Sequence, residues 1–134
     1  MAKILIVDDS DIIRLQVRQA LTELGHEVIE AIDGQDGYEK ASSHRNIDLI
    51  IADFNMPALS GLEMCKKIRT IDEYAAVTVI ILTTETSPEL RARCREVGIR
   101  YWIVKPVVAD AFKQAVSKVI DSIRKLAQSG EPRA

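Results

Sequence analysis

The sequence contains no apolar run that approaches the roughly 18 residues needed to cross a bilayer as a helix. Its first apolar stretch, residues 4–7, ends at an acidic pair, so it does not resemble a secretory signal peptide either. Lysine and arginine form no block, and the formal net charge at pH 7 is only −2, which excludes an obvious nucleic-acid or membrane-surface patch. We therefore expect a cytoplasmic protein that binds neither nucleic acid nor membranes.

Cysteine is scarce as well. Cys65 and Cys94 show no Cys-x-x-Cys spacing and no neighbouring histidine pattern, which argues against a zinc site and against a redox pair. We expect both to be small buried thiols. What remains is an ordinary globular composition, 134 residues with 47% hydrophobic and 28% charged residues. This favours one domain, placed at residues 1–127, followed by a flexible tail at 128–134.

Four short apolar runs end on polar residues that are suited to phosphate or metal binding. They are residues 4–7 with Asp8 and Asp9, 49–52 with Asp53, 79–82 with Thr83, and 101–104 with Lys105. Unbroken runs of this kind, separated by helical patterns, are typical of parallel strands covered on both faces. Since ligands bind beyond the carboxyl ends of such strands, we expect these polar side chains to converge.

Helical patterns and their end signals alternate with these strands. The expected helices cover 13–24, a region including 38–42, 60 to 68 or 70, 88–97, and 110–127, and a short strand covers 27–31. Ser60 and Glu63 form a capping-box signature, Ser87-Pro88 predicts a helix start, and Asp33-Gly34 predicts a turn. Five strands alternating with five helices predict a doubly wound α/β sheet, because crossovers between parallel strands are right-handed.

The last helix carries two apolar ridges. We assign the core stripe to Val108, Phe112, Ala115, Val119, Ile123 and Leu126, and a second ridge to Val116, Ile120 and Ala127. The second ridge has two interpretations: it widens the buried face, or it is a partner or dimer surface.

The acidic residues predict a divalent cation. Asp8 and Asp9 beside Asp53 are unfavourable unless positive charge lies among them, and Mg²⁺ together with Lys105 balances the three carboxylates. Mg²⁺ suits a sparse set of carboxylates better than Ca²⁺ does, and Mn²⁺ is expected to substitute. With the charge screened, Asp53 is the best placed nucleophile toward a phosphoryl group, Lys105 would pair with the phosphoryl oxygens, and Thr83 would donate a hydrogen bond.

Over about residues 3–127, the chain resembles the receiver domain of bacterial two-component response regulators, in particular the single-domain chemotaxis members of that family. The motifs are the acidic pair, Asp53 followed by Asn55-Met56-Pro57, Thr83, and Lys105-Pro106, in that order. The resemblance implies a flavodoxin-like (βα)5 three-layer sandwich with sheet order 2-1-3-4-5. It also implies that the protein is a signalling switch, with no catalytic activity other than its own phosphorylation and dephosphorylation.

The resemblance further implies roles for single residues. Asp9, Asp53 and the backbone carbonyl of Asn55 would hold the metal, Asp8 would assist through water, and the peptide before Pro106 would be cis. Thr83 and an aromatic residue of the last strand form the family's switch. That aromatic is Trp102 here, where tyrosine or phenylalanine is usual.

Three positions are implied to tune phosphoryl hydrolysis. Thr84 is a departure, because the family generally has alanine or glycine there. Asn55 and Glu85 resemble the fast-cycling chemotaxis members. The implied partners are a histidine kinase or histidine phosphotransfer protein and a downstream protein that binds the face formed by helix four, strand five and helix five, with the chain itself a monomer or weak dimer.

Two alternatives remain at this point. A Mg²⁺-dependent phosphohydrolase of the haloacid dehalogenase type attacks through the first Asp of an Asp-x-Asp pair, and Asp9-Ser10-Asp11 offers that spacing. No cap domain or late acidic metal motif accompanies it. The second alternative is a receiver-like scaffold that binds partners without being phosphorylated.

Overall fold

A five-stranded parallel sheet in the order β2-β1-β3-β4-β5 forms the centre of the computed structural model, which describes residues 1–85 and 87–129. The strands are β1 (Lys3–Val7), β2 (Glu27–Ala31), β3 (Leu49–Asp53), β4 (Thr78–Thr83) and β5 (Tyr101–Val104). The helices are α1 (Asp11–Glu23), α2 (Gly34–Ser43), α3 (Gly61–Ile68), α4 (Pro88–Glu96) and α5 (Ala109–Ser129), with a 3₁₀ turn η1 (Asp72–Tyr74). The predicted flavodoxin-like fold and strand order are confirmed.

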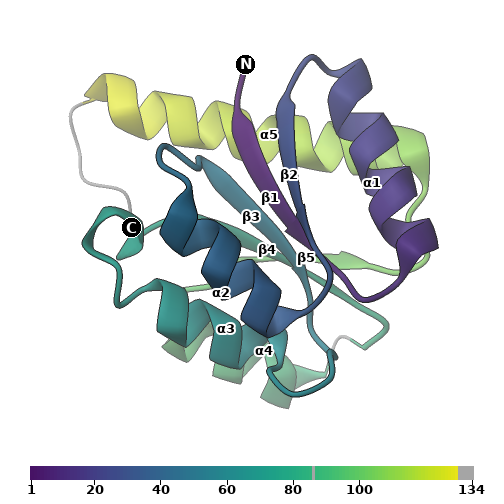
Figure 1. Ribbon diagram of the computed structural model, residues 1–134. Helices are drawn as coiled ribbons and strands as arrows, with labels where there is room; N and C mark the ends of the chain where they lie inside the picture. Colours follow the sequence, from purple (N-terminus) through teal and green to yellow (C-terminus); the bar gives the residue numbers. More distant parts are fainter. Residues whose placement is uncertain (86, 130–134) are drawn as a thin grey trace.

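The helices cover both faces of the sheet, with α1 and α5 on one face and α2, α3 and α4 on the other (Figure 1). Alternate residues of each inner strand enter opposite cores: Leu5 packs with the α2-α3-α4 side, and Ile4 packs with the α1-α5 side. Both side chains are fully buried. This explains why the strands are unbroken apolar runs, since neither face meets water.

Most of the predicted helix ends are confirmed. Ser60 and Glu63 make both hydrogen bonds of the capping box, and Ser87 caps α4 by accepting from the Leu90 N–H. Gly25 and Gly98 follow α1 and α4 with φ of 85° and 80°, a conformation that favours glycine.

The predicted turn at Asp33-Gly34 is wrong. Asp33 is the N-cap of α2, and its side chain accepts a 2.8 Å hydrogen bond from the Asp36 N–H, so the helix begins at Gly34. Asp-Gly is a turn signal, but an aspartate is equally good at an N-cap. Glycine is needed next because a Cβ there would clash with the Leu59 carbonyl oxygen.

The buried stripe of α5 differs from the prediction. Phe112, Val116, Val119, Ile120 and Ile123 are the buried apolar residues of this helix, so the second ridge is core and the partner-surface interpretation of Val116 and Ile120 is wrong. Val108 precedes the helix and is 60% exposed, Ala115 and Leu126 are half-buried, and Ala127 is exposed. Periodicity identified the amphipathic helix, but its rotation depends on how it packs against β1, β4 and α1.

The C-terminal boundary also shifts. The helix α5 continues to Ser129, so residues 128 and 129 are helical rather than part of a tail, and residues 130–134 lie outside the described residues. Among the described helices, none combines the length and the hydropathy that a bilayer span requires.

Cys65 and Cys94 are both buried and free, as expected. Burial raises the pKa of the Cys65 thiol to about 12, so it stays protonated and acts as a small apolar side chain.

The turn between β3 and α3 yields a prediction about stability. Ala58 has φ of 66° at the centre of a tight turn closed by a 2.7 Å hydrogen bond from the Leu59 N–H to the Pro57 carbonyl. Since a Cβ costs about 1–2 kcal/mol in this region, we expect Ala58→Gly to raise the free energy of unfolding by about 1 kcal/mol in urea denaturation. Ala75, exposed with φ of −55°, is the matched control. Ala75→Gly should lower the stability, and a loss of stability in both variants would contradict the argument.

Candidate functional site

Strand register brings the acidic residues together. Val7 of β1 pairs with Ala52 of β3, so the residues that follow, Asp8 and Asp53, lie side by side at the carboxyl edge of the sheet. β1 lies between β2 and β3, at the point where the strand order reverses, which is the usual ligand position in such sheets. Carboxylate oxygens of Asp8, Asp9 and Asp53 lie within 4.8 Å of one another. The predicted convergence is therefore present.

Lys105 reaches this cluster from the end of β5. Its Nζ lies 3.1 Å from Oδ1 of Asp53 and 3.3 Å from Oδ2 of Asp8. The peptide bond between Lys105 and Pro106 is cis, as the family resemblance implied. One ammonium thus serves two carboxylates, and a third carboxylate, Asp9, lies beside them exposed to solvent.

The site holds more negative than positive charge. Asp8 and Asp53 are buried, and burial together with the charge of Asp8 raises the pKa of Asp53, although hydrogen bonds from Lys105 and from the Asn55 N–H oppose this shift. Burial by itself would lower the pKa of Lys105, but its hydrogen bond to Asp53 and the charges of both aspartates raise it. The lysine is therefore fully protonated at neutral pH, and its single positive charge does not balance the three acidic side chains of the cluster.

The donor set fits a hard divalent cation. Oδ1 of Asp8 accepts a 2.9 Å hydrogen bond from the Ser10 N–H. Oδ2 is buried and accepts no well-aligned hydrogen bond from the described residues, despite its 3.3 Å distance to Lys105. An unsatisfied buried carboxylate oxygen beside two further carboxylates is the arrangement that Mg²⁺ coordination would satisfy.

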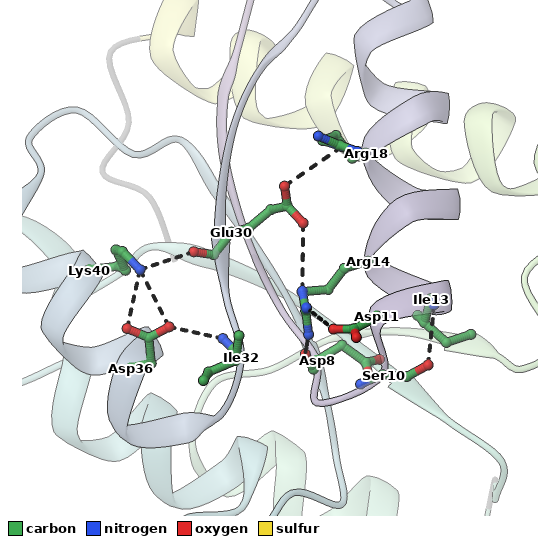
Figure 2. Close-up of polar contacts among 10 residues, drawn as sticks. All are labelled: Asp8, Ser10, Asp11, Ile13, Arg14, Arg18, Glu30, Ile32, Asp36 and Lys40. Carbon is green, nitrogen blue, oxygen red and sulfur yellow. Dashed lines mark hydrogen bonds and ion pairs between the residues drawn. The ribbon is translucent and has the colours of Figure 1, made fainter.

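Neither Asp8 nor Asp9 caps α1. Ser10 is the N-cap, since its Oγ accepts from the Ile13 N–H at 3.3 Å (Figure 2). Asp11, in the first turn, is 91% exposed and pairs with Arg14. It is not among the clustered carboxylates, so the described residues do not assemble the Asp9-Ser10-Asp11 arrangement of the phosphohydrolase alternative.

Thr83 ends β4 at the same edge of the sheet and is buried. Its Oγ1 accepts a 3.1 Å hydrogen bond from the Glu85 N–H, which leaves its own proton available as a donor. Thr84, Glu85 and Asn55 are exposed, and the backbone N–H of Asn55 donates a hydrogen bond to Asp53. These positions are compatible with the predicted roles and do not test them.

Trp102 lies on the face of β5 that packs against the core on the α2-α3-α4 side, whereas Tyr101 and Ile103 pack on the other side, as strand alternation predicts. The guanidinium of Arg91 lies 5.8 Å from the centroid of the indole ring. The indole Nε1 is buried and has no acceptor among the described residues.

Two residues at the site were not found from the sequence. Gly61 approaches β3 so closely that a Cβ would clash with the Asp53 carbonyl oxygen. Arg14 donates to the backbone carbonyl of Asp8 at 2.6 Å. The i, i+3 spacing of Asp11 and Arg14 predicts their ion pair, but no sequence pattern indicates that the guanidinium also reaches the acidic loop.

Comparisons with known proteins agree with this geometry. The family model of the response regulator receiver domain matches residues 4–117. A chemotaxis protein CheY homolog of Campylobacter jejuni is 33% identical over 119 residues, which cover 88% of this chain and 92% of the relative.

Two solved structures are similar throughout. The chemotaxis protein CheY4 of Vibrio cholerae has 39% identity and a TM-score of 0.82, with 92% of this chain and 98% of that chain covered. A chain of the CheX–CheY–BeF3–Mg²⁺ complex from Borrelia burgdorferi has 30% identity and a TM-score of 0.81, with 89% of each chain covered.

The raised pKa of Asp53 predicts how stability depends on pH. The folded state keeps the Asp53 proton to a higher pH than the unfolded chain does, so stability falls as the pH rises from about 3.9, the unfolded pKa, through the folded pKa. Without divalent cations at pH 7, Asp53→Asn should therefore be more stable than wild type, by more than the roughly 0.5 kcal/mol scatter of surface substitutions.

Urea unfolding across the acid range is the measurement, and the difference between the two proteins should shrink toward low pH. Asp121→Asn, which changes an exposed aspartate of α5, is the control and should leave stability unchanged. Equal stability of wild type and Asp53→Asn at pH 7 would contradict the charge excess.

Proposed function

Because the chain belongs to the response regulator receiver domain family, we propose that it is a phosphoacceptor signalling switch of a two-component system. Asp53 accepts a phosphoryl group from a phosphohistidine of a histidine kinase or histidine phosphotransfer protein, and the modification changes the affinity for a downstream protein. The observation that carries this proposal is the cluster of Asp8, Asp9, Asp53 and Lys105 at the switch point of the sheet.

The residues have distinct tasks in the transfer. An oxygen of the Asp53 carboxylate attacks phosphorus in line, a P–O bond forms, and the P–N bond to the donor imidazole breaks, after which the imidazole takes a proton from water. Lys105, already beside Asp53, pairs with a phosphoryl oxygen, and the Thr83 hydroxyl donates to another.

Mg²⁺ would be held by Asp8, Asp9, Asp53 and the backbone carbonyl of Asn55, with Mn²⁺ as a substitute. When bound, the ion neutralises the excess charge of the carboxylates and of the incoming phosphoryl group. This assignment is supported by the unsatisfied Asp8 oxygen and by the acidic cluster. It is also supported by the Borrelia burgdorferi relative, whose complex contains BeF3 and Mg²⁺.

In this proposal, Thr83 and Trp102 transmit the output. Thr83 moves toward the phosphoryl group and the indole rearranges, which alters the face formed by α4, β5 and α5, the surface that a protein partner binds. Thr84, Glu85 and Asn55 set the hydrolysis rate of the phosphorylated carboxylate. The chain acts as a monomer or weak dimer.

Phosphorylation on Asp53 is directly testable. With Mg²⁺ and phosphoramidate, we expect a single hydroxylamine-labile phosphoryl group on wild type, and no label on Asp53→Asn, because the amide is not a nucleophile. Mass spectrometry checks both. Asp11→Asn, altering an exposed aspartate outside the cluster, should be labelled like wild type.

The alternatives give different results. Steady hydrolysis of a small phosphate ester that is lost in Asp9→Asn but kept in Asp53→Asn would identify a phosphohydrolase instead. Signalling in cells that Asp53→Asn leaves unchanged would identify a scaffold.

Cation binding should also stabilise the fold by mass action. At a Mg²⁺ concentration of 100 times Kd, the free energy of unfolding should rise by about 2.7 kcal/mol, and Trp102 fluorescence should report the titration. Asp9→Asn removes an exposed ligand without disturbing the core, so it should keep its stability and lose most of this increment. An increment of equal size in Asp9→Asn would mean that Mg²⁺ binds elsewhere.

A further inference from the structure

Arg14 connects the acidic loop to two other elements of the fold (Figure 2). Its side chain is only 13% exposed. Nη1 donates to the backbone carbonyl of Asp8 at 2.6 Å, Nη2 pairs with the carboxylate of Asp11, and Nε lies 3.6 Å from Oε1 of Glu30 on β2. The guanidinium is therefore held from three directions around the loop that follows β1.

Glu30 on β2, which pairs with Arg14, is held in place by further contacts. Oε2 of Glu30 lies 3.6 Å from Nε of Arg18, one turn further along α1, so each carboxylate oxygen faces a guanidinium. The Glu30 backbone carbonyl accepts a 3.2 Å hydrogen bond from Lys40, which also pairs with Asp36 on α2. This network, drawn in Figure 2, joins α1, β2 and α2.

The Asp8 carbonyl matters because of what is attached to it. That carbonyl and the Asp9 N–H belong to one planar peptide unit, and the plane sets where Asp9 projects relative to Asp8. The Asp8 carboxylate has its own restraints, the Ser10 N–H and Lys105. The Asp9 side chain is exposed and shows no hydrogen bond or ion pair within the described part of the chain, so only the backbone, through the positions of Cα and Cβ, restrains where its carboxylate can reach.

We propose that Arg14 is a positioning residue for the cation site: by fixing the Asp8–Asp9 peptide against β2, it aims the Asp9 carboxylate at the space shared with Asp8 and Asp53. The ligand, Mg²⁺, is taken from the proposed function. Arg14 would not touch the ion, and its effect passes through the peptide plane.

An electrostatic role and a positioning role of Arg14 predict opposite changes in Mg²⁺ affinity when the residue is neutralised. Removing a cation next to an acidic cluster strengthens the attraction for Mg²⁺ by Coulomb's law, so electrostatics alone predicts tighter binding when Arg14 is neutralised. Positioning predicts weaker binding, since supporting residues of metal sites typically contribute roughly 10- to 100-fold in affinity. The sign of the change separates the two.

The experiment is calorimetric titration of the full chain with Mg²⁺ alone. Arg14→Met should raise Kd at least roughly tenfold, and Arg14→Lys should not restore it, because one ammonium cannot reach the Asp8 carbonyl, Asp11 and Glu30 together. Glu30→Gln, which weakens the anchor, should raise Kd several-fold. Arg18→Met is the matched control: it loses a Glu30 contact without touching Asp8, so its Kd should stay within about twofold of wild type.

Several outcomes overturn the proposal: unchanged or tighter binding in Arg14→Met, full rescue by Arg14→Lys, or an equal loss in Arg18→Met. If Arg14→Met does not fold, as judged by urea unfolding without Mg²⁺, Arg14→Lys and Glu30→Gln decide on the same criteria.

Phosphoryl labelling of Asp53 distinguishes a failure of this proposal from a failure of the proposed function. If Mg²⁺ binding depends on Arg14 but wild type is not phosphorylated, only the proposed function is refuted. If wild type is phosphorylated but its Kd for Mg²⁺ does not depend on Arg14, only the positioning role is refuted. No Mg²⁺ uptake by wild type refutes both.

Discussion

The excess of negative charge at the carboxyl edge of the sheet is the constraint on which the rest of the structure depends. Three carboxylates gather around a single ammonium, and two of them, Asp8 and Asp53, are buried. Burial raises the free energy of each unpaired charge because the charge loses its hydration. The single positive charge of Lys105 neutralises the carboxylates only in part. A divalent cation is a partner whose charge can balance the remaining carboxylates, and with the cation bound the site can also accept an anionic phosphoryl group.

The fold supplies the rigidity that such a cluster needs. β1 and β3 lie in the middle of a sheet covered on both faces, so their carboxyl ends are fixed by packing on either side. The β3–α3 loop folds back until Gly61 lies against the Asp53 carbonyl, where no larger residue fits without movement. Like charges are thus held together by an apolar core whose burial offsets their repulsion.

Two arrangements involve the edge strands of the sheet. On one side, Arg14 and Glu30 tie the acidic loop to the edge strand β2. On the other, Trp102 occupies the edge strand β5 with its indole N–H buried and without an acceptor among the described residues, at a cost of about 1–3 kcal/mol. The first arrangement combines a hydrogen bond to the Asp8 carbonyl with ion pairs to Asp11 and Glu30, whereas the second leaves a buried polar group unsatisfied.

Sequence alone determined the strands, the caps of α3 and α4 and the identity of the clustered residues, because unbroken apolar runs and capping patterns are local signals and parallel strands end at one edge. It did not determine that Asp33-Gly34 starts a helix or that Val116 and Ile120 belong to the core, since these depend on which surfaces meet. Only the tertiary structure decided that Lys105 bridges Asp8 and Asp53 and that Arg14 reaches the Asp8 carbonyl. The physical reason is that such contacts join residues from different elements, and their directions are fixed by packing rather than by spacing along the chain.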